Sequence, residues 1–75
     1  MNLSDRQLNA VVEFNDLHDA DLTDFHTPEE IFFRFIMGAN MEPNGMGEYM
    51  IEVGGCESKT GNPEIFYIDC ELVYL

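Results

Sequence analysis

Apart from its carboxylates, this 75-residue chain has few side chains that could act as acids, bases or nucleophiles. Its two histidines are His18 and His26, and its two cysteines are Cys56 and Cys70. Nucleophilic catalysis needs a hydroxyl or thiol with a base held in reach, and no motif here joins such a pair. Two carboxylates for acid–base catalysis are always available in a chain with 15 acidic residues, so their presence is uninformative. We therefore expect a protein that is not an enzyme and has no catalytic residue.

One stretch partly matches the calcium-binding EF-hand pattern. Positions 1, 3, 5 and 12 of that pattern would be Asp19, Asp21, Thr23 and Glu30. However, an aspartate stands where the sharp turn needs glycine, and no second loop is present to pair with this one. The two histidines among these aspartates also lack a metal-ligand spacing. We interpret residues 15–26 as the frayed end of a helix followed by an acidic connector and expect no metal or cofactor, with weak calcium binding as an open alternative.

A second stretch, residues 54–60, superficially resembles a phosphate-binding loop. Ser58 stands where that loop has glycine before the lysine, the spacing is one residue short, and no helix is predicted to follow. A hairpin turn is the favoured interpretation.

The cysteines form neither a Cys-x-x-C motif nor a cysteine–histidine cluster, so we expect free thiols. With no apolar run of about 20 residues and no secretory signal at the amino terminus, a cytoplasmic location is expected.

Charge is the strongest feature of the sequence. The 15 acidic and 3 basic residues give a net charge of −12, which repels phosphate, so we expect direct binding to neither nucleic acid nor a membrane. Between Arg6 and Arg34 there are seven carboxylates and no basic residue. At helical spacing, carboxylates lie about 5–6 Å apart, which is comparable with phosphates along a nucleic-acid strand. The predicted partner-binding residues are these seven and four from the predicted hairpin: Glu13, Asp16, Asp19, Asp21, Asp24, Glu29, Glu30, Glu48, Glu52, Asp69 and Glu71.

In size, charge and lack of a catalytic motif, the chain resembles a functional class of small acidic inhibitors. These come from bacteriophages and mobile elements and include anti-CRISPR and anti-restriction proteins, which occupy DNA- or RNA-binding surfaces of host defence enzymes. The resemblance implies a nucleic-acid mimic that binds a basic nucleic-acid-binding protein or enzyme complex. Two alternatives stay open. One is an immunity protein or antitoxin that neutralises a basic toxin, and the other is a structural or regulatory interaction module whose acidity only keeps it soluble.

Two helices are predicted to carry the first group of carboxylates. Residues 4–7 fit a capping box, with Leu3 and Leu8 as a hydrophobic staple, and the apolar spacing predicts a helix from Asp5 to residues 17–20. Thr27 as N-cap and Pro28 at the first helical position predict the start of a second helix, which ends near residue 37.

The second helix is apolar on most sides, which predicts burial. We expect Ile31, Phe32, Phe35 and Ile36 in the core. The alternative is that Phe33 and Met37 project outward as a docking patch.

Two strands are predicted after the helices, over residues 48–53 and 64–75, because apolar and polar residues alternate there. A turn near residues 58–60 would place Val53 opposite Phe66 and Tyr49 opposite Cys70. The predicted fold is one acidic α+β domain over residues 1–75, with two helices followed by an antiparallel β-hairpin packed on the second helix. The predicted core is completed by Tyr49, Ile51, Phe66 and Ile68. The apolar end at residues 73–75 would suit pairing with a second copy, so a homodimer is also expected.

Overall fold

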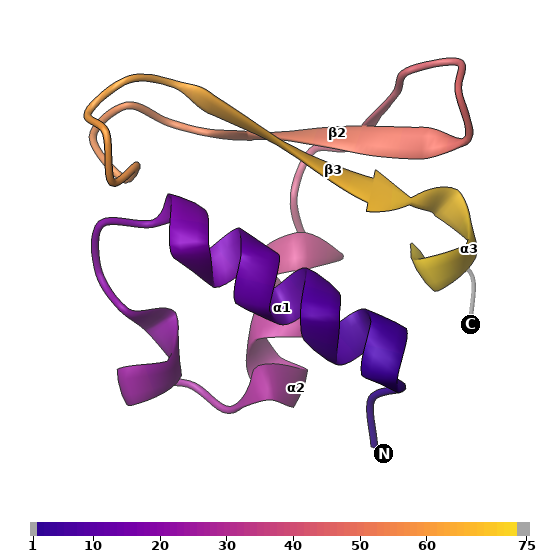
Figure 1. The fold of residues 1–75 in the computed structure, drawn as a ribbon, viewed down its shortest axis with the longest axis horizontal. Coiled ribbons are helices and arrows are strands. Elements are labelled where there is room, and N and C mark those ends of the chain that lie inside the picture. The colour runs from indigo at the N-terminus through magenta and orange to yellow at the C-terminus, as the bar shows by residue number, and fades with distance from the viewer. Residues whose placement is uncertain (1, 74–75) are drawn as a thin grey trace.

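The protein forms an antiparallel sheet with its helices packed on one side, as Figure 1 shows. This computed structural model describes residues 2–73. The elements, in chain order, are α1 (Asp5–Leu17), η1 (Leu22–Asp24), α2 (Pro28–Glu30), η2 (Ile31–Ile36), β1 (Glu42–Pro43), β2 (Glu48–Val53), β3 (Glu64–Asp69) and α3 (Cys70–Val73). The predicted α+β class is confirmed, whereas the predicted order of two helices and two strands is incomplete, since it lacks β1 and α3.

Both predicted helix starts are confirmed by their capping boxes. Ser4 Oγ accepts a hydrogen bond from Gln7 N at 3.2 Å, and Gln7 Oε1 accepts one from Ser4 N at 2.8 Å. Thr27 and Glu30 exchange the same pair of bonds at 3.2 and 3.0 Å. These bonds satisfy backbone donors that have no partner within the helix.

The second helix widens after its first turn. Met37 N donates to Phe32 O at 2.9 Å, a five-residue step that defines the π-helix η2. At Gly38 a Cβ atom would lie 2.4 Å from the Arg34 carbonyl oxygen, so glycine is required where this helix ends.

The sheet has a third strand that the sequence did not predict. Strand β1 pairs with β2 through Glu42 opposite Met50 and Pro43 opposite Tyr49. The prediction failed because residues 42–45 contain proline, asparagine and glycine, which are typical of a structure break. Here they build a tight connection, in which Asn44 N donates to Glu48 O at 3.0 Å.

The predicted long carboxy-terminal strand is wrong over residues 70–73. Residues 70–73 form α3, whose first turn begins where Asp69 Oδ1 accepts a hydrogen bond from Glu71 N at 3.0 Å.

The β2–β3 register places Val53 opposite Glu64 and Tyr49 opposite Ile68, two residues from the predicted register. A shift of two residues keeps every side chain on its predicted face of the sheet. Of the apolar end predicted to pair with a second copy, residues 74 and 75 lie outside the described residues, and Val73 packs against the core.

The core lies between the sheet and both long helices rather than under the second helix alone. The predicted core residues Ile31, Phe32, Ile36, Ile51, Phe66 and Ile68 are all buried. Helix α1 adds Ala10, Val11 and Phe14, and the Phe14 ring meets Phe66 edge-on at a centroid distance of 5.1 Å. Phe35 and Tyr49 are only partly buried. Phe33 and Met37 are partly buried against the same core, so they do not form the exposed docking patch considered above.

Candidate partner-binding surface

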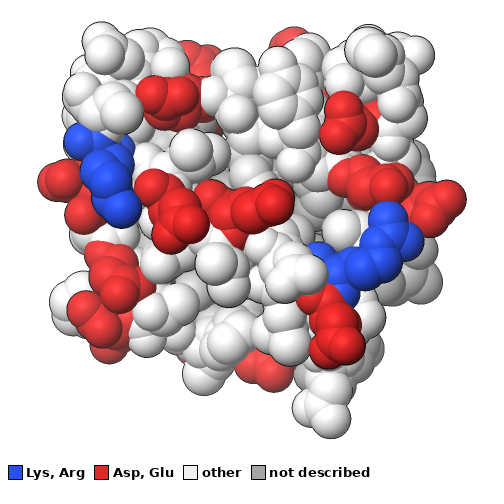
Figure 2. All heavy atoms as spheres, in the orientation of Figure 1, with Lys and Arg blue, Asp and Glu red and all other residues white. Residues whose placement is uncertain are grey.

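The carboxylates between Arg6 and Arg34 do not form one regular row. Helix α1 carries Glu13 and Asp16 three residues apart, while Asp19, Asp21 and Asp24 lie in the connector and in η1, outside the long helices. Figure 2, drawn in the orientation of Figure 1, shows acidic side chains in several separate groups on the visible face of the molecule, with uncharged surface between them. The phosphate-like spacing considered for a helix edge is therefore present only at Glu13 and Asp16.

Asp21 is occupied within the fold. Its Oδ1 accepts hydrogen bonds from Thr23 Oγ1 at 2.6 Å, Asn15 Nδ2 at 2.9 Å and Thr23 N at 3.1 Å. The Thr23 hydroxyl makes the largest contribution to holding the pKa of Asp21 below its usual value. This carboxylate is the N-cap of η1, so its first role is structural.

Glu30 is occupied in the same way. It accepts the Thr27 backbone N–H, which is the main reason that its pKa is lowered, and it lies 3.6 Å from Arg34 Nη1. Asp21 and Glu30 thus serve as caps, each through one of its two carboxylate oxygens. Within residues 2–73, no group of three or more His, Cys, Asp or Glu side chains could hold a metal ion.

Six of the predicted partner-binding carboxylates have no hydrogen bond or ion pair from their side chains within the described part of the chain. Glu29 in α2 is half-buried, and the others are exposed: Glu13, Asp16, Asp19, Asp24 and Glu52. An exposed carboxylate without an internal partner can pair with an external cation without breaking a contact of the fold.

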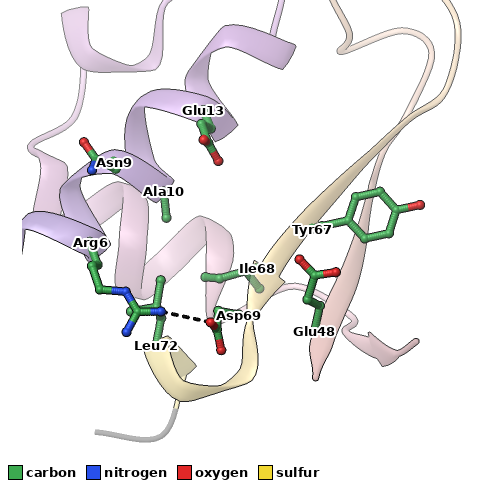
Figure 3. A pocket seen from close by; sticks show the side chains of 9 residues that line it. All are labelled: Arg6, Asn9, Ala10, Glu13, Glu48, Tyr67, Ile68, Asp69 and Leu72. Carbon is green, nitrogen blue, oxygen red and sulfur yellow. Dashed lines mark hydrogen bonds and ion pairs between the residues drawn. The ribbon is translucent and has the colours of Figure 1, made fainter. Parts of the chain in front are cut away.

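The structure brings three of the predicted carboxylates to one hollow at the outer side of β3. Glu13 comes from α1, Glu48 from β2 and Asp69 from β3, and Figure 3 shows them around the same space as Arg6 and Tyr67. We call this the β3-edge hollow, and it is lined by Arg6, Asn9, Ala10, Glu13, Glu48, Tyr67, Ile68, Asp69 and Leu72.

Within the β3-edge hollow, Arg6 offsets part of the acidic charge. Its Nη2 lies 2.9 Å from Asp69 Oδ2, and its Nη1 lies 3.3 Å from Glu71 Oε2. Glu48 and Asp69 stand directly opposite each other in the β2–β3 register, an arrangement of like charges that is destabilising by itself. The hollow therefore keeps an excess of negative charge even with Arg6 in place.

Two apolar side chains that were not predicted as binding residues are exposed on β3, and one of them, Tyr67, lines the β3-edge hollow. On the face of the sheet away from the helices, Ile65 is 43% exposed and Tyr67 is 51% exposed. Apolar residues at the centre of a charged rim are typical of protein–protein interfaces. The signal was present in the sequence, since Ile65 and Tyr67 alternate with the buried Phe66 and Ile68.

A second feature missed at the sequence level is His18, at the end of α1. Its ring packs on Phe14 at a centroid distance of 4.7 Å, and its Nε2 is buried with no hydrogen-bond partner among residues 2–73. Burial lowers the pKa of His18, and the nearby Glu57 carboxylate raises it by a smaller amount.

The loop between β2 and β3 is held against this end of α1. Lys59 N donates to Leu17 O, and Asp19 N donates to Glu57 O, both at 2.9 Å. The Lys59 backbone N–H is thus used inside the fold, which agrees with the interpretation of residues 54–60 as a connection rather than a phosphate loop. Cys56 in this loop is exposed, and Cys70 is half-buried at the start of α3; both are free thiols.

Comparison of the chain with protein-family models, with curated proteins and with solved structures finds no match. Among the residues that the structure describes, no helix has the length and apolar character needed to cross a bilayer.

Proposed function

We propose that this protein is an inhibitor that binds a basic nucleic-acid-binding protein, or an enzyme complex that contains one, with carboxylates in the place of phosphates. The observation that carries the proposal is the set of exposed carboxylates without internal partners, in a chain of net charge −12. The fold uses some acidic groups as caps or as partners of Arg6, and it leaves Glu13, Asp16, Asp19, Asp24 and Glu52 exposed without an internal partner.

The proposal rests on the electrostatic field rather than on a regular row of charges. Self-repulsion at this charge density destabilises a folded chain, and a basic partner would relieve it. Complementary fields speed the encounter of two proteins, and salt screens them beyond a Debye length of about 10 Å at 0.1 M. Binding should therefore be fast at low salt and weaken steeply as salt rises.

The partner is sought first by capture from a lysate of the source cells at low and high salt, followed by identification by mass. A nucleic-acid-binding enzyme that salt releases would support the proposal. A toxin without nucleic-acid affinity would support the immunity-protein alternative instead. Absence of any partner at every salt concentration would overturn the proposal.

Competition against an oligonucleotide is the decisive measurement. The wild-type protein should displace labelled oligonucleotide from the captured target. Replacing three free carboxylates together, Asp16→Asn, Asp19→Asn and Asp24→Asn, should weaken displacement by about threefold to a hundredfold, since exposed ion pairs contribute about 0.2–1 kcal/mol each.

A control of equal charge change separates a local effect from a general one. Asp5→Asn, Glu42→Gln and Glu57→Gln together also remove three exposed carboxylates, at positions outside the predicted set. This control variant should compete better than the first. If the first variant competes as well as the wild type, the free carboxylates do not imitate phosphates.

A further inference from the structure

Strand β3 leaves one edge of the sheet open. The strand order is β1-β2-β3, so among residues 2–73 strand β3 has a neighbouring strand on one side only. Cys70 N donates to Gly47 O at 3.0 Å, which fixes the alternation of the antiparallel pairs. By that alternation, the backbone of Phe66 and Ile68 faces β2, while the N–H and C=O groups of Ile65 and Tyr67 face away from it.

No other segment of residues 2–73 forms backbone hydrogen bonds with Ile65 or Tyr67. Natural proteins usually protect such an edge with lysine, proline, a bulge or a covering segment. The middle of this edge instead carries an isoleucine and a tyrosine, both about half exposed. An extended segment of another chain could pair with these groups as an added strand.

The charges around the edge indicate the chemistry of that segment. Glu13 on α1, Glu48 on β2 and Asp69 at the end of β3 all line the β3-edge hollow, where Arg6 is the one cation among the lining residues. A second copy of this chain would bring the same carboxylates against each other, with a net charge of −12 on each copy. A segment rich in lysine or arginine would instead meet carboxylates that come from α1, from β2 and from β3 itself.

We propose that an extended basic segment of the partner adds to the sheet as a fourth strand along β3. Its backbone pairs with Ile65 and Tyr67, and its basic side chains face Glu13, Glu48 and Asp69. This inference rests on the proposed function, because it describes how the same basic partner is held. It adds a requirement that a charge-only contact does not have, namely backbone pairing at two defined residues.

A blocked peptide of alternating lysine and valine serves as the probe. Amide hydrogen exchange measured by NMR should show fast exchange at Ile65 and Tyr67 in the free protein and slow exchange at Phe66 and Ile68. Adding the peptide should slow Ile65 and Tyr67 at least tenfold and leave the other two unchanged. The same peptide methylated at every backbone nitrogen keeps its charge but lacks N–H donors, so it should bind about tenfold more weakly.

The variant Ile65→Pro tests the edge from the protein side. It removes an N–H that β2 does not use, and proline is tolerated at outward positions of edge strands. Peptide affinity should fall about tenfold or more while the amide spectrum of β2 is retained. Should this variant not fold, the methylated peptide still decides the matter. Equal binding of both peptides, or no binding of either at low salt, would overturn the proposal.

Two further results would overturn the added strand, and each can be told apart from failure of the proposed function. Protection of Ile65 and Tyr67 that is already present in the free protein and grows with protein concentration would show that a second copy occupies the edge, which overturns the proposal. If the captured target binds Ile65→Pro as tightly as the wild type, the added strand is excluded while the proposed function stands. The proposed function fails separately, by the oligonucleotide competition described above.

Discussion

At the scale of single residues, the acidic side chains divide into two kinds. Asp21 accepts hydrogen bonds from the Thr23 hydroxyl, the Asn15 amide and the Thr23 N–H, and Glu30 accepts the Thr27 N–H; these bonds lower the pKa of both carboxylates. Asp16, Asp19 and Asp24 have no such partner among the described residues. Composition alone makes these five residues equivalent. The difference between the two kinds depends on which side chains lie within reach of a helix start. Of the two capping roles, only that of Glu30 could be predicted from local sequence.

His18 should make the stability of the protein depend on pH. Its pKa in the folded chain lies below the ordinary value of 6.5 because burial disfavours the charged ring. The unfolded chain therefore takes up the proton more readily, so the free energy of unfolding is unaffected by His18 above pH 6.5 and decreases as the pH falls through it. Urea unfolding of the wild type and His18→Asn at pH 7.5 and 5 should show the wild type losing more stability, with carboxylate effects common to both. An NMR titration of His18 at or above pH 6.5 would contradict this.

Gly38 should tolerate no side chain. The Cβ of Gly38→Ala would meet the Arg34 carbonyl oxygen at 2.4 Å, and backbone atoms cannot move aside cheaply. We expect the free energy of unfolding to fall by about 1–3 kcal/mol, as in other overpacked sites. Gly54→Ala is the matched control, since a Cβ there meets nothing within 4 Å, and it should leave stability unchanged or slightly raised. Equal losses in the two variants would refute the steric explanation.

At the scale of elements, the sequence predicted what local interactions determine. Both long helices begin at the predicted residues because capping boxes act within four residues. The alternation in β2 and β3 placed every strand residue on its correct face. By contrast, β1 forms because Glu42 and Pro43 pair with β2, which follows them in the chain. Helix α3 forms at residues 70–73, where the alternation of apolar and polar residues would also have allowed β3 to continue. Propensity does not decide such cases, because tertiary packing outweighs it.

Asn44 should control the β1–β2 connection. Its Oδ1 accepts from Met46 N at 2.8 Å and from Glu48 N at 3.2 Å, and its backbone N–H donates to Glu48 O. Asn44→Ala removes the side-chain oxygen that both backbone N–H groups share, so we expect a loss of about 1–2 kcal/mol in the free energy of unfolding. Asn40→Ala, an exposed position in the segment before β1, should change it by less than about 0.5 kcal/mol. Urea unfolding of both variants measures the difference, and indistinguishable midpoints would show that the turn does not need this side chain.

At the scale of the whole molecule, charge sets both stability and the surface offered to partners. Glu48 and Asp69 were both predicted as binding residues of the hairpin, and they stand opposite each other. Glu13 joins them only because α1 packs beside β3, a contact that no local pattern encodes. The open edge at Ile65 and Tyr67 likewise follows from strand order, which a two-strand prediction leaves undefined.

Salt should stabilise the isolated protein. With a net charge of −12, screening weakens repulsion within the folded chain, so the free energy of unfolding should rise between 10 and 300 mM sodium chloride. The variant with Asp16→Asn, Asp19→Asn and Asp24→Asn should be more stable than the wild type by about 0.5 kcal/mol at low salt, and salt should stabilise it less. Urea unfolding at the two salt concentrations tests both statements. A wild type that loses stability on adding salt would show that Arg6 and Arg34 ion pairs outweigh the repulsion.

The contact between α1 and β3 has a consequence for the order of events during synthesis. Arg6 and Asp69 are separated by 63 residues, and at about 5–20 residues per second the ribosome needs about 3–13 seconds to make the chain between them. During that interval the apolar face of α1, with Val11 and Phe14, has no sheet to cover it. Isolated helices of this length are marginal in water. The nascent chain must therefore stay largely unfolded until β3 leaves the exit tunnel, and its many carboxylates then keep neighbouring nascent chains apart.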